Sequence, residues 1–166
     1  MTNFLSFTGT ITMINDFWYP NKEGCYKIFT VENNEGLIVN FIIEPHTYFV
    51  DHFTANIGDE IEGYYDGDVP VALIYPPQYR ALVINKISPF RDVMVSYFDE
   101  NLLSSDKTLK LNISNSTEIV LQNDQLFTRS PQNHDLIVIY NYVTKSIPAQ
   151  TTPLKIIVFC NHISSS

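Results

Sequence analysis

Two clusters of aromatic side chains beside prolines are the residues of this sequence best suited to bind a ligand. The first cluster is the run Tyr75-Pro76-Pro77-Gln78-Tyr79. Because proline fixes φ and lacks an N–H, consecutive prolines cannot extend a strand. The run therefore predicts a rigid loop that holds two tyrosine rings for stacking. The Tyr75–Pro76 bond is a candidate for the cis form. The alternative role is a rigid plug over the core.

The second cluster is Trp18-Tyr19-Pro20-Asn21. Aromatic anchors dominate the energetics of interfaces, so an exposed Trp18 would mark a binding surface. The alternative is a lid that covers the core. We predict one binding surface that contains Trp18, Tyr19 and the run from Tyr75 to Tyr79.

The acidic and histidine side chains lack the spacing of a metal site. Asp66-Gly67-Asp68 offers two carboxylates for Ca²⁺ or Mg²⁺, but the further acids of a calcium loop are missing. An Asp-Gly turn is the favoured interpretation, and Asp66 and Asp68 stay weak metal candidates. The histidines have no zinc-site spacing; they are His46, His52, His134 and His162. We expect no metal and no cofactor.

Motifs that specify a reaction are absent from the sequence. There is no Gly-x-Ser-x-Gly elbow, no phosphate loop and no dinucleotide fingerprint. Pairs of carboxylates occur in any acidic protein and need a cleft to become a catalytic site. We therefore expect a protein that is not an enzyme.

The charge of the chain limits its partners. The formal net charge is −8, of which residues 1–89 carry −7 and residues 90–166 carry −1. An acidic surface lacks the attraction that supplies most nucleic-acid affinity and most binding to anionic membranes. We expect a protein, a peptide or a small neutral ligand as the partner, no membrane association, and leave a homo-oligomer open.

The cellular compartment is inferred from the start of the chain and from its cysteines. The first residues lack the basic segment and the apolar run of a secretory signal, and no apolar stretch is long enough to span a membrane. Two cysteines, Cys25 and Cys160, are too few for a disulfide framework. We expect a cytoplasmic protein in which both thiols are reduced and fill gaps in the core.

The segments that must position these residues have the pattern of β-strands. Residues 7–14 alternate between apolar side chains and threonines, with Gly9 at an inward position that suits a bend. Residues 26–31 and 37–43 flank a turn rich in Asn and Gly and predict a hairpin. No segment has the apolar stripe of a helix. The predicted fold class is therefore all-β.

The second half of the chain repeats the pattern of the first. The matching blocks are Leu37–Ile42 with Leu109–Ser114, Thr47–Val50 with Thr117–Val120, Asp59–Tyr65 with His134–Tyr140, and Arg80–Ile84 with Lys155–Phe159. A proline-marked loop precedes the last strand in both halves. This order predicts an internal repeat, in which residues 1–88 form a complete unit and residues 89–166 a trimmed one. The first unit has 15 aromatic residues and the second 7.

Each unit fits a small barrel. Five short strands, a glycine in the opening strand and a hairpin for strands two and three are typical of the OB-fold, a five-stranded, partly open Greek-key barrel. We therefore predict two tandem OB-like Greek-key barrels related by an internal repeat. In an OB-fold the loops between strands one and two and between strands four and five border the binding face. Those loops would hold the two aromatic clusters.

The segment Tyr65–Ile84, together with Thr47–Val50, resembles the signature of an uncharacterised family of small OB-like domains in anaerobic spore-forming Gram-positive bacteria. In that family a Tyr-Asp pair, a proline-rich loop and Tyr-Pro-Pro-Gln-Tyr precede the last strand. The resemblance covers the first unit and reaches the second only through the repeat. It implies the barrel fold, and it implies no activity, ligand or catalytic residue.

Together these patterns favour a non-enzymatic binding or interaction module that uses the rim of the first barrel. The alternative is a structural or self-assembling protein, with sporulation as the candidate process, because unpaired strand edges can join copies of a chain. Single-stranded nucleic-acid binding is a third hypothesis by analogy with other OB-folds, and the negative charge disfavours it.

Overall fold

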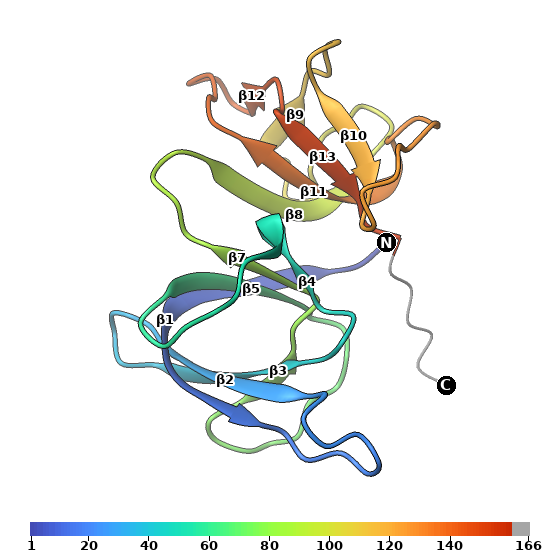
Figure 1. Ribbon diagram of the computed structural model, residues 1–166. Helices are drawn as coiled ribbons and strands as arrows, with labels where there is room; N and C mark the ends of the chain where they lie inside the picture. Colours follow the sequence, from blue (N-terminus) through green and yellow to red (C-terminus); the bar gives the residue numbers. More distant parts are fainter. Residues whose placement is uncertain (161–166) are drawn as a thin grey trace. The chain divides into compact units, whose positions relative to one another are not determined.

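The computed structural model describes residues 1–160. They divide into two compact units, one formed by Phe4–Ile87 and the other by Met1–Asn3 with the chain from Ser88 onward. Strands build both units, a single 3₁₀ turn spans Val50–His52, and residues 1–160 contain no α-helix (Figure 1). The all-β prediction is confirmed.

Seven strands form one sheet in the first unit. They are β1 (Phe4–Asp16), β2 (Lys27–Glu32), β3 (Ile38–Ile43), β4 (Tyr48–Phe49), β5 (Glu60–Asp66), β6 (Gln78–Arg80) and β7 (Val83–Lys86). β1 pairs with β2, β2 with β3, and β3 with β6 in parallel. β6 continues into β7, which pairs with β5, and β5 pairs with β1. The pairing thus returns to the strand where it began.

β1 belongs to both sides of this circuit because it changes partner along its length. Phe4–Thr10 pairs with β5 and Thr10–Asp16 pairs with β2, with a register shift between Ile11 and Met13. Gly9 lies at this change of partner and is buried. A Cβ at Gly9 would lie 2.5 Å from the carbonyl oxygen of Glu32, so only glycine allows the close approach of β2. The bend expected at Gly9 is present.

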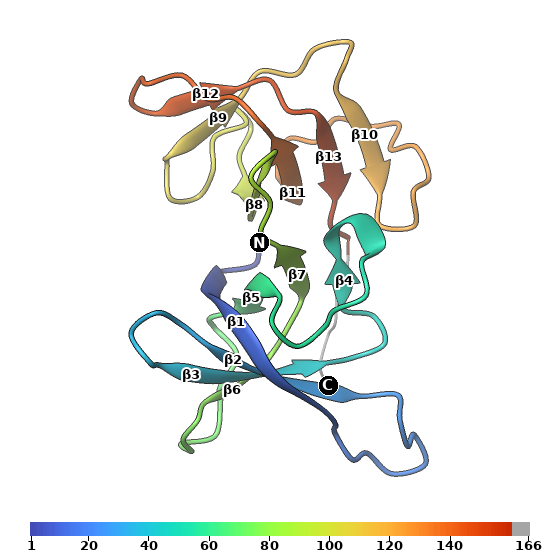
Figure 2. The same ribbon diagram turned by 60° about the vertical axis from the view of Figure 1, so that its left-hand side comes forward.

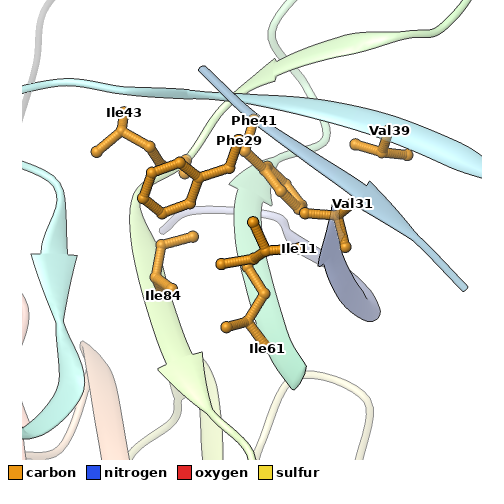
Figure 3. Packing of buried hydrophobic residues seen from close by; sticks show 9 residues of the cluster. Ile11, Phe29, Val31, Val39, Phe41, Ile43, Ile61 and Ile84 are labelled. Carbon is orange, nitrogen blue, oxygen red and sulfur yellow. The ribbon is translucent and has the colours of Figure 1, made fainter. Parts of the chain in front are cut away.

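The core of the first unit fills the space that the strands enclose. Alternate residues of each strand point inward, which follows from the two-residue period of a strand. The buried cluster consists of Ile11, Phe29, Val31, Val39, Phe41, Ile43, Ile61, Ala81 and Ile84, most of which are labelled in Figure 3. Gly63 leaves room for the ring of Phe41, because a Cβ at Gly63 would lie 2.5 Å from that ring.

The second unit contains four strand pairs and fewer paired residues than the first. Its strands are β8 (Asp92–Phe98), β9 (Leu109–Leu111), β10 (Glu118–Leu121), β11 (His134–Tyr140), β12 (Ala149–Thr151) and β13 (Lys155–Val158). β8 pairs with β11, β11 with β13, β13 with β10 in parallel, and β9 with β12 in parallel. Single bridges at Ser104 and Leu103 stand where β2 stands in the first unit. The pairing scheme is that of the first unit with one strand reduced.

Side-chain hydrogen bonds also recur at equivalent places. The hydroxyl of Thr47 donates to the carbonyl of Ala81 at 3.0 Å and accepts from the N–H of Glu44 at 2.9 Å. The hydroxyl of Thr117 donates to the carbonyl of Pro153 at 2.8 Å and accepts from the N–H of Ser114 at 3.4 Å. Both threonines are buried. Each ties the end of a strand to the segment between the last two strands.

The strand pairing corrects two blocks of the sequence alignment. Asn40 pairs with Gln78, and its equivalent in the second unit is Lys110, which pairs with Gln150, rather than Asn112. A shift of two residues keeps every side chain on its face, so alternation cannot detect it. In the last strand Lys155 occupies the position of Val83 rather than Arg80. The runs Ala81–Ile84 and Ile156–Phe159 in the aligned blocks are uninterrupted apolar residues, so no alternation fixes the register.

The cysteine prediction is wrong in one respect. Both Cys25 and Cys160 are free thiols, but both are exposed rather than packed in a core. Cys25 lies in the loop before β2, and Cys160 follows the end of β13, so neither belongs to a strand that faces inward. Among residues 1–160 no helix has the length and apolar character needed to cross a membrane.

Candidate binding face of the first unit

The loop of residues 17–26 joins β1 to β2 and holds the first aromatic cluster. The ring of Trp18 is 71% exposed. Tyr19 stacks on Tyr26 with ring centroids 4.7 Å apart and an interplanar angle of 11°, and the ammonium of Lys22 lies 5.9 Å from the Tyr19 ring. At the base of the loop, Lys27 and Asp16 form an ion pair at 2.7 Å. The stacked pair stiffens a loop that leaves Trp18 in solvent.

The loop of residues 67–77 joins β5 to β6 and is exposed from Gly67 to Tyr75. Its entry is a turn in which the carboxylate of Asp66 accepts the N–H of Asp68 at 2.9 Å. The Tyr75–Pro76 bond is cis. Large apolar side chains that point into solvent follow one another here; they are Val69, Val71, Leu73, Ile74 and Tyr75. This loop is a defined apolar projection and does not cover the core.

Tyr79 differs from Tyr75 in its surroundings. Tyr75 is 73% exposed, whereas Tyr79 is half-buried and stacks on Tyr65 at 3.9 Å with an interplanar angle of 5°. Both rings of this pair lie against Phe41. Burial, the neighbouring charge of Tyr79 and a hydrogen bond with Tyr79 raise the pKa of Tyr65 to about 12. Tyr79 therefore anchors the loop to the core, and Tyr75 is the ring available to a ligand.

Between the two loops lies the outward face of β1, β2, β3 and β6. Two rows of directly paired residues cross these strands. The first row is Met13, Thr30, Asn40 and Gln78, and the second is Asn15, Ile28, Ile42 and Arg80. Paired residues in neighbouring strands point to the same side. Since Phe29, Val31 and Phe41 belong to the core, both rows face away from it. We call these eight residues the candidate face.

Both aromatic loops extend beyond the candidate face. In Figures 1 and 2 the loop after β1 and the loop before β6 project past the layer of β2 and β3, on the side away from β5 and β7. The first loop leaves from the end of β1 beside the second row, and the second loop ends at Gln78 in the first row. The two clusters predicted from the sequence thus border one face.

The candidate face offers neutral polar groups rather than charge. The hydroxyl of Thr30 donates to the amide oxygen of Asn40 at 2.7 Å, which leaves the two N–H groups of that amide for another acceptor. Asn15 and Gln78 add two more amides, and Arg80 is its one charged side chain. Such a face hydrogen-bonds to a ligand without requiring that the ligand be charged.

The metal candidates have no matching cluster. Within the described part of the chain, no three His, Cys, Asp or Glu side chains are grouped to hold a metal ion. The carboxylate of Asp66 is used in the turn with Asp68, as an Asp-Gly turn requires. Of the four histidines, His162 lies outside the described residues.

A comparison with protein-family models and with curated proteins found no match to this chain. The resemblance to a family of OB-like domains stays a prediction.

The sequence analysis singled out the two loops beside the candidate face but not the strand residues between them. Trp18, Tyr19 and Tyr75 are exposed in the loops of residues 17–26 and 67–77, and Pro76, Pro77 and Gln78 form the half-buried entry to β6. Thr30, Asn40 and Ile42 were not singled out. A signal existed, since these residues are the outward positions of the predicted hairpin, where polar and apolar side chains alternate with core residues.

Proposed function

We propose that the chain is a non-enzymatic binding module whose recognition surface is the candidate face with its two aromatic loops. The observation that carries the proposal is the exposure of Trp18 and Tyr75 on loops that border one face. Exposed large aromatic rings cost solvation free energy, and they are enriched where proteins bind partners. The stacked Tyr19–Tyr26 and Tyr65–Tyr79 pairs hold the two loops in place before a ligand arrives.

We further propose that both units are OB-like barrels. The support is the order of pairing, in which β1 contacts β2 and β5, and the last strand is parallel to β3 and antiparallel to β5. A five-stranded Greek-key barrel has this connectivity when β6 and β7 are counted as one strand. In that fold the face of strands two and three and its two flanking loops bind ligands.

The proposal is tested by comparing the interactions of two variants. The double variant Trp18→Ala with Tyr75→Ala removes both exposed rings, and Tyr142→Ala removes an exposed ring of the second unit as a control. Proteins cross-linked from an extract of the source cells and small neutral ligands detected by thermal shift are compared for wild type and both variants. We expect the double variant to lose interactions that the control keeps. If every detected interaction survives the double variant, the proposal is wrong.

Self-assembly is a second candidate, and the apolar projection of residues 67–77 favours it. Leu73 and Ile74 at its tip are exposed, and patches of this kind are uncommon on monomeric proteins unless they bind something. Light scattering over a range of concentrations tests this candidate. Growth in mass that Leu73→Asp abolishes would support it, and a strict monomer at high concentration would exclude it.

A further inference from the structure

We propose that the candidate face binds a neutral oligosaccharide chain. This inference rests on the proposed function and names the chemical class of its ligand. Three properties of the face carry it: the exposed aromatic rings at its borders, the uncharged polar groups on its floor, and the negative charge of the unit that surrounds it.

The aromatic borders match the shape of a sugar ring. One side of a pyranose presents several C–H bonds, which are weakly positive and contact the electron-rich face of an aromatic ring. Trp18 is 71% exposed and Tyr75 is 73% exposed, and each stands on its own loop. Neither ring takes part in the stacked tyrosine pairs, which consist of Tyr19 with Tyr26 and of Tyr65 with Tyr79. Two such platforms on opposite borders suit a chain of sugar units.

The floor between the borders supplies partners for hydroxyl groups. A sugar hydroxyl both donates and accepts, and amide side chains do the same. Asn15, Asn40 and Gln78 are amides on the two rows, and Thr30 fixes the orientation of Asn40 through a hydrogen bond of 2.7 Å. Ile28 is partly exposed beside them and gives apolar contact for the C–H side of the ring, whereas its neighbour Ile42 is only 7% exposed.

The charge of the unit selects against anionic ligands. Residues 1–89 carry a net charge of −7 with four basic side chains. Two of these, Lys27 and Lys86, already pair with Asp16 and Asp59. A nucleic acid or an acidic polysaccharide would therefore meet repulsion, while a neutral chain pays no such penalty.

An extended peptide fits this face less well than a sugar chain. A peptide that adds to a sheet needs a free strand edge for its backbone hydrogen bonds. β2 pairs with β1 and β3, and β3 pairs with β2 and β6, so the two central strands of the floor offer no edge. The strand at the end of the sheet, β6, has only three residues, which is too few to hold a long added strand. A ligand on the two central strands therefore meets side chains, which are amides, one hydroxyl, apolar groups and the single charged side chain of Arg80, with aromatic rings at the borders.

The inference is tested with neutral glycans of known structure. The full chain is run in affinity electrophoresis through gels that contain hydroxyethyl cellulose, galactomannan, dextran or chitin oligomers, with heparin and an oligothymidine as anionic probes. Positive glycans are then titrated as oligosaccharides by calorimetry. The variants are Trp18→Ala and Gln78→Ala on the face, with Tyr142→Ala and Gln150→Ala as matched changes in the second unit. The expected loss is about tenfold in affinity for each face variant and none for the matched changes.

Each outcome decides between the two proposals. Binding of a neutral glycan that the face variants weaken supports the inference. If no neutral glycan binds, or if binding ignores the face variants, the glycan assignment is wrong. The proposed function still stands in that case if cross-linked partners depend on Trp18 and Tyr75, and a peptide or protein partner takes the place of the glycan. If those partners also ignore both rings, the face is not a binding surface.

Discussion

The two units share a pattern of strand pairing but differ in the side chains and loops on their outward faces. β1 has 13 residues and bends to meet two partners, whereas its equivalent β8 has 7 residues. The strand after β8 is reduced to bridges at Leu103 and Ser104, and the loop between them is short. The second unit therefore lacks the rows that cross four strands in the first. The comparison teaches that strand pairing is retained where the core requires it, while the outward face exists in one unit alone.

Two equivalent positions show the difference at the level of side chains. Gln78 and Gln150 occupy the same place in the parallel pair, but the amide of Gln150 accepts a hydrogen bond from Asn112 at 3.0 Å. The residue before the cis proline is Tyr75 in the first unit and Ile147 in the second. Exchange of a tyrosine for an isoleucine removes an aromatic platform. The second unit thus keeps a loop with a cis proline, but the aromatic ring before that proline is absent.

The largest effect is expected where a glycine of the first unit is replaced by the residue of the second. Gly63 and Val138 are equivalent, since each pairs with an isoleucine of the last strand. We expect Gly63→Val to lower the free energy of unfolding by about 3 kcal/mol, because the new side chain collides with the ring of Phe41. Urea unfolding followed by circular dichroism measures the loss. Unchanged stability would show that the Phe41 ring can move to another conformation that makes room for the new side chain.

The shared threonine bond predicts similar losses in both units. Thr47→Val and Thr117→Val each leave a buried carbonyl and an N–H without their hydroxyl partner, at a cost of about 1.5 kcal/mol. We expect the smaller loss at Thr117, whose contact with Ser114 is longer. Denaturant titration of each variant is compared with Thr8→Val on the exposed side of β1. If only one of the two threonine variants lost stability, the two hydrogen bonds would not be equivalent.

The stacked tyrosines give the first unit a sensitivity to alkali. The pKa of Tyr65 is raised from 10.0 to about 12, so the folded state holds this proton more tightly than the unfolded state does. The stabilisation is complete below pH 10 and is lost as the pH rises toward 12. Unfolding by urea at several alkaline pH values should show a smaller decline in Tyr65→Phe than in wild type. An equal decline would assign the effect to other tyrosines.

The hairpin turns of the two units should respond differently to acid, with an effect on stability smaller than those above. In the first turn the amide oxygen of Asn33 accepts the N–H groups of Glu35 and Leu37, both at 2.9 Å. In the second, burial alone would raise the pKa of Asp106, but hydrogen bonds from Ser104 and Thr108 hold it below its ordinary value.

A lowered pKa means that Asp106 stabilises the fold above the unfolded pKa and that this contribution is lost as the pH falls through the folded value. We therefore expect acid to weaken the second unit at this turn and not the first. The loss of stability between neutral and acidic pH, measured by urea unfolding, should be smaller in Asp106→Asn than in wild type. Asn33→Ala serves as the control, and it should lower stability equally at both pH values.

The smallest effect on stability is expected at the rim. Trp18 is exposed, so Trp18→Ala should change the free energy of unfolding by less than about 0.5 kcal/mol. Trp18 is the single tryptophan of the chain, and its fluorescence should be accessible to acrylamide in the folded protein. A large loss of stability, or a tryptophan shielded from the quencher, would mean that Trp18 is a lid over the core after all.

Much of the frame was predictable from local pattern. Alternation in residues 7–14 and 37–43, the turn before Leu37 and the glycine at position 9 predicted the bent first strand and the hairpin. Thr47 and Thr117 were aligned correctly because the four-residue blocks around them share both apolar pattern and threonine. The register of the third strand was not predictable, because a slip by two residues leaves an alternating pattern unchanged. The last strand was misaligned because the apolar runs Ala81–Ile84 and Ile156–Phe159 carry no alternation.

The sequence by itself determined that the chain is all-β, that its halves are alike and that Trp18 and Tyr75 stand in loops. These properties follow from the period of apolar residues and from the rigidity of proline, which act over a few neighbouring residues. Only the tertiary structure decided that Tyr79 packs on Tyr65 while Tyr75 stays in solvent, and that Asn40, Gln78 and Arg80 share a face. Residues from strands far apart in sequence meet there because the pairing of β3 with β6 is set by the packing of the core.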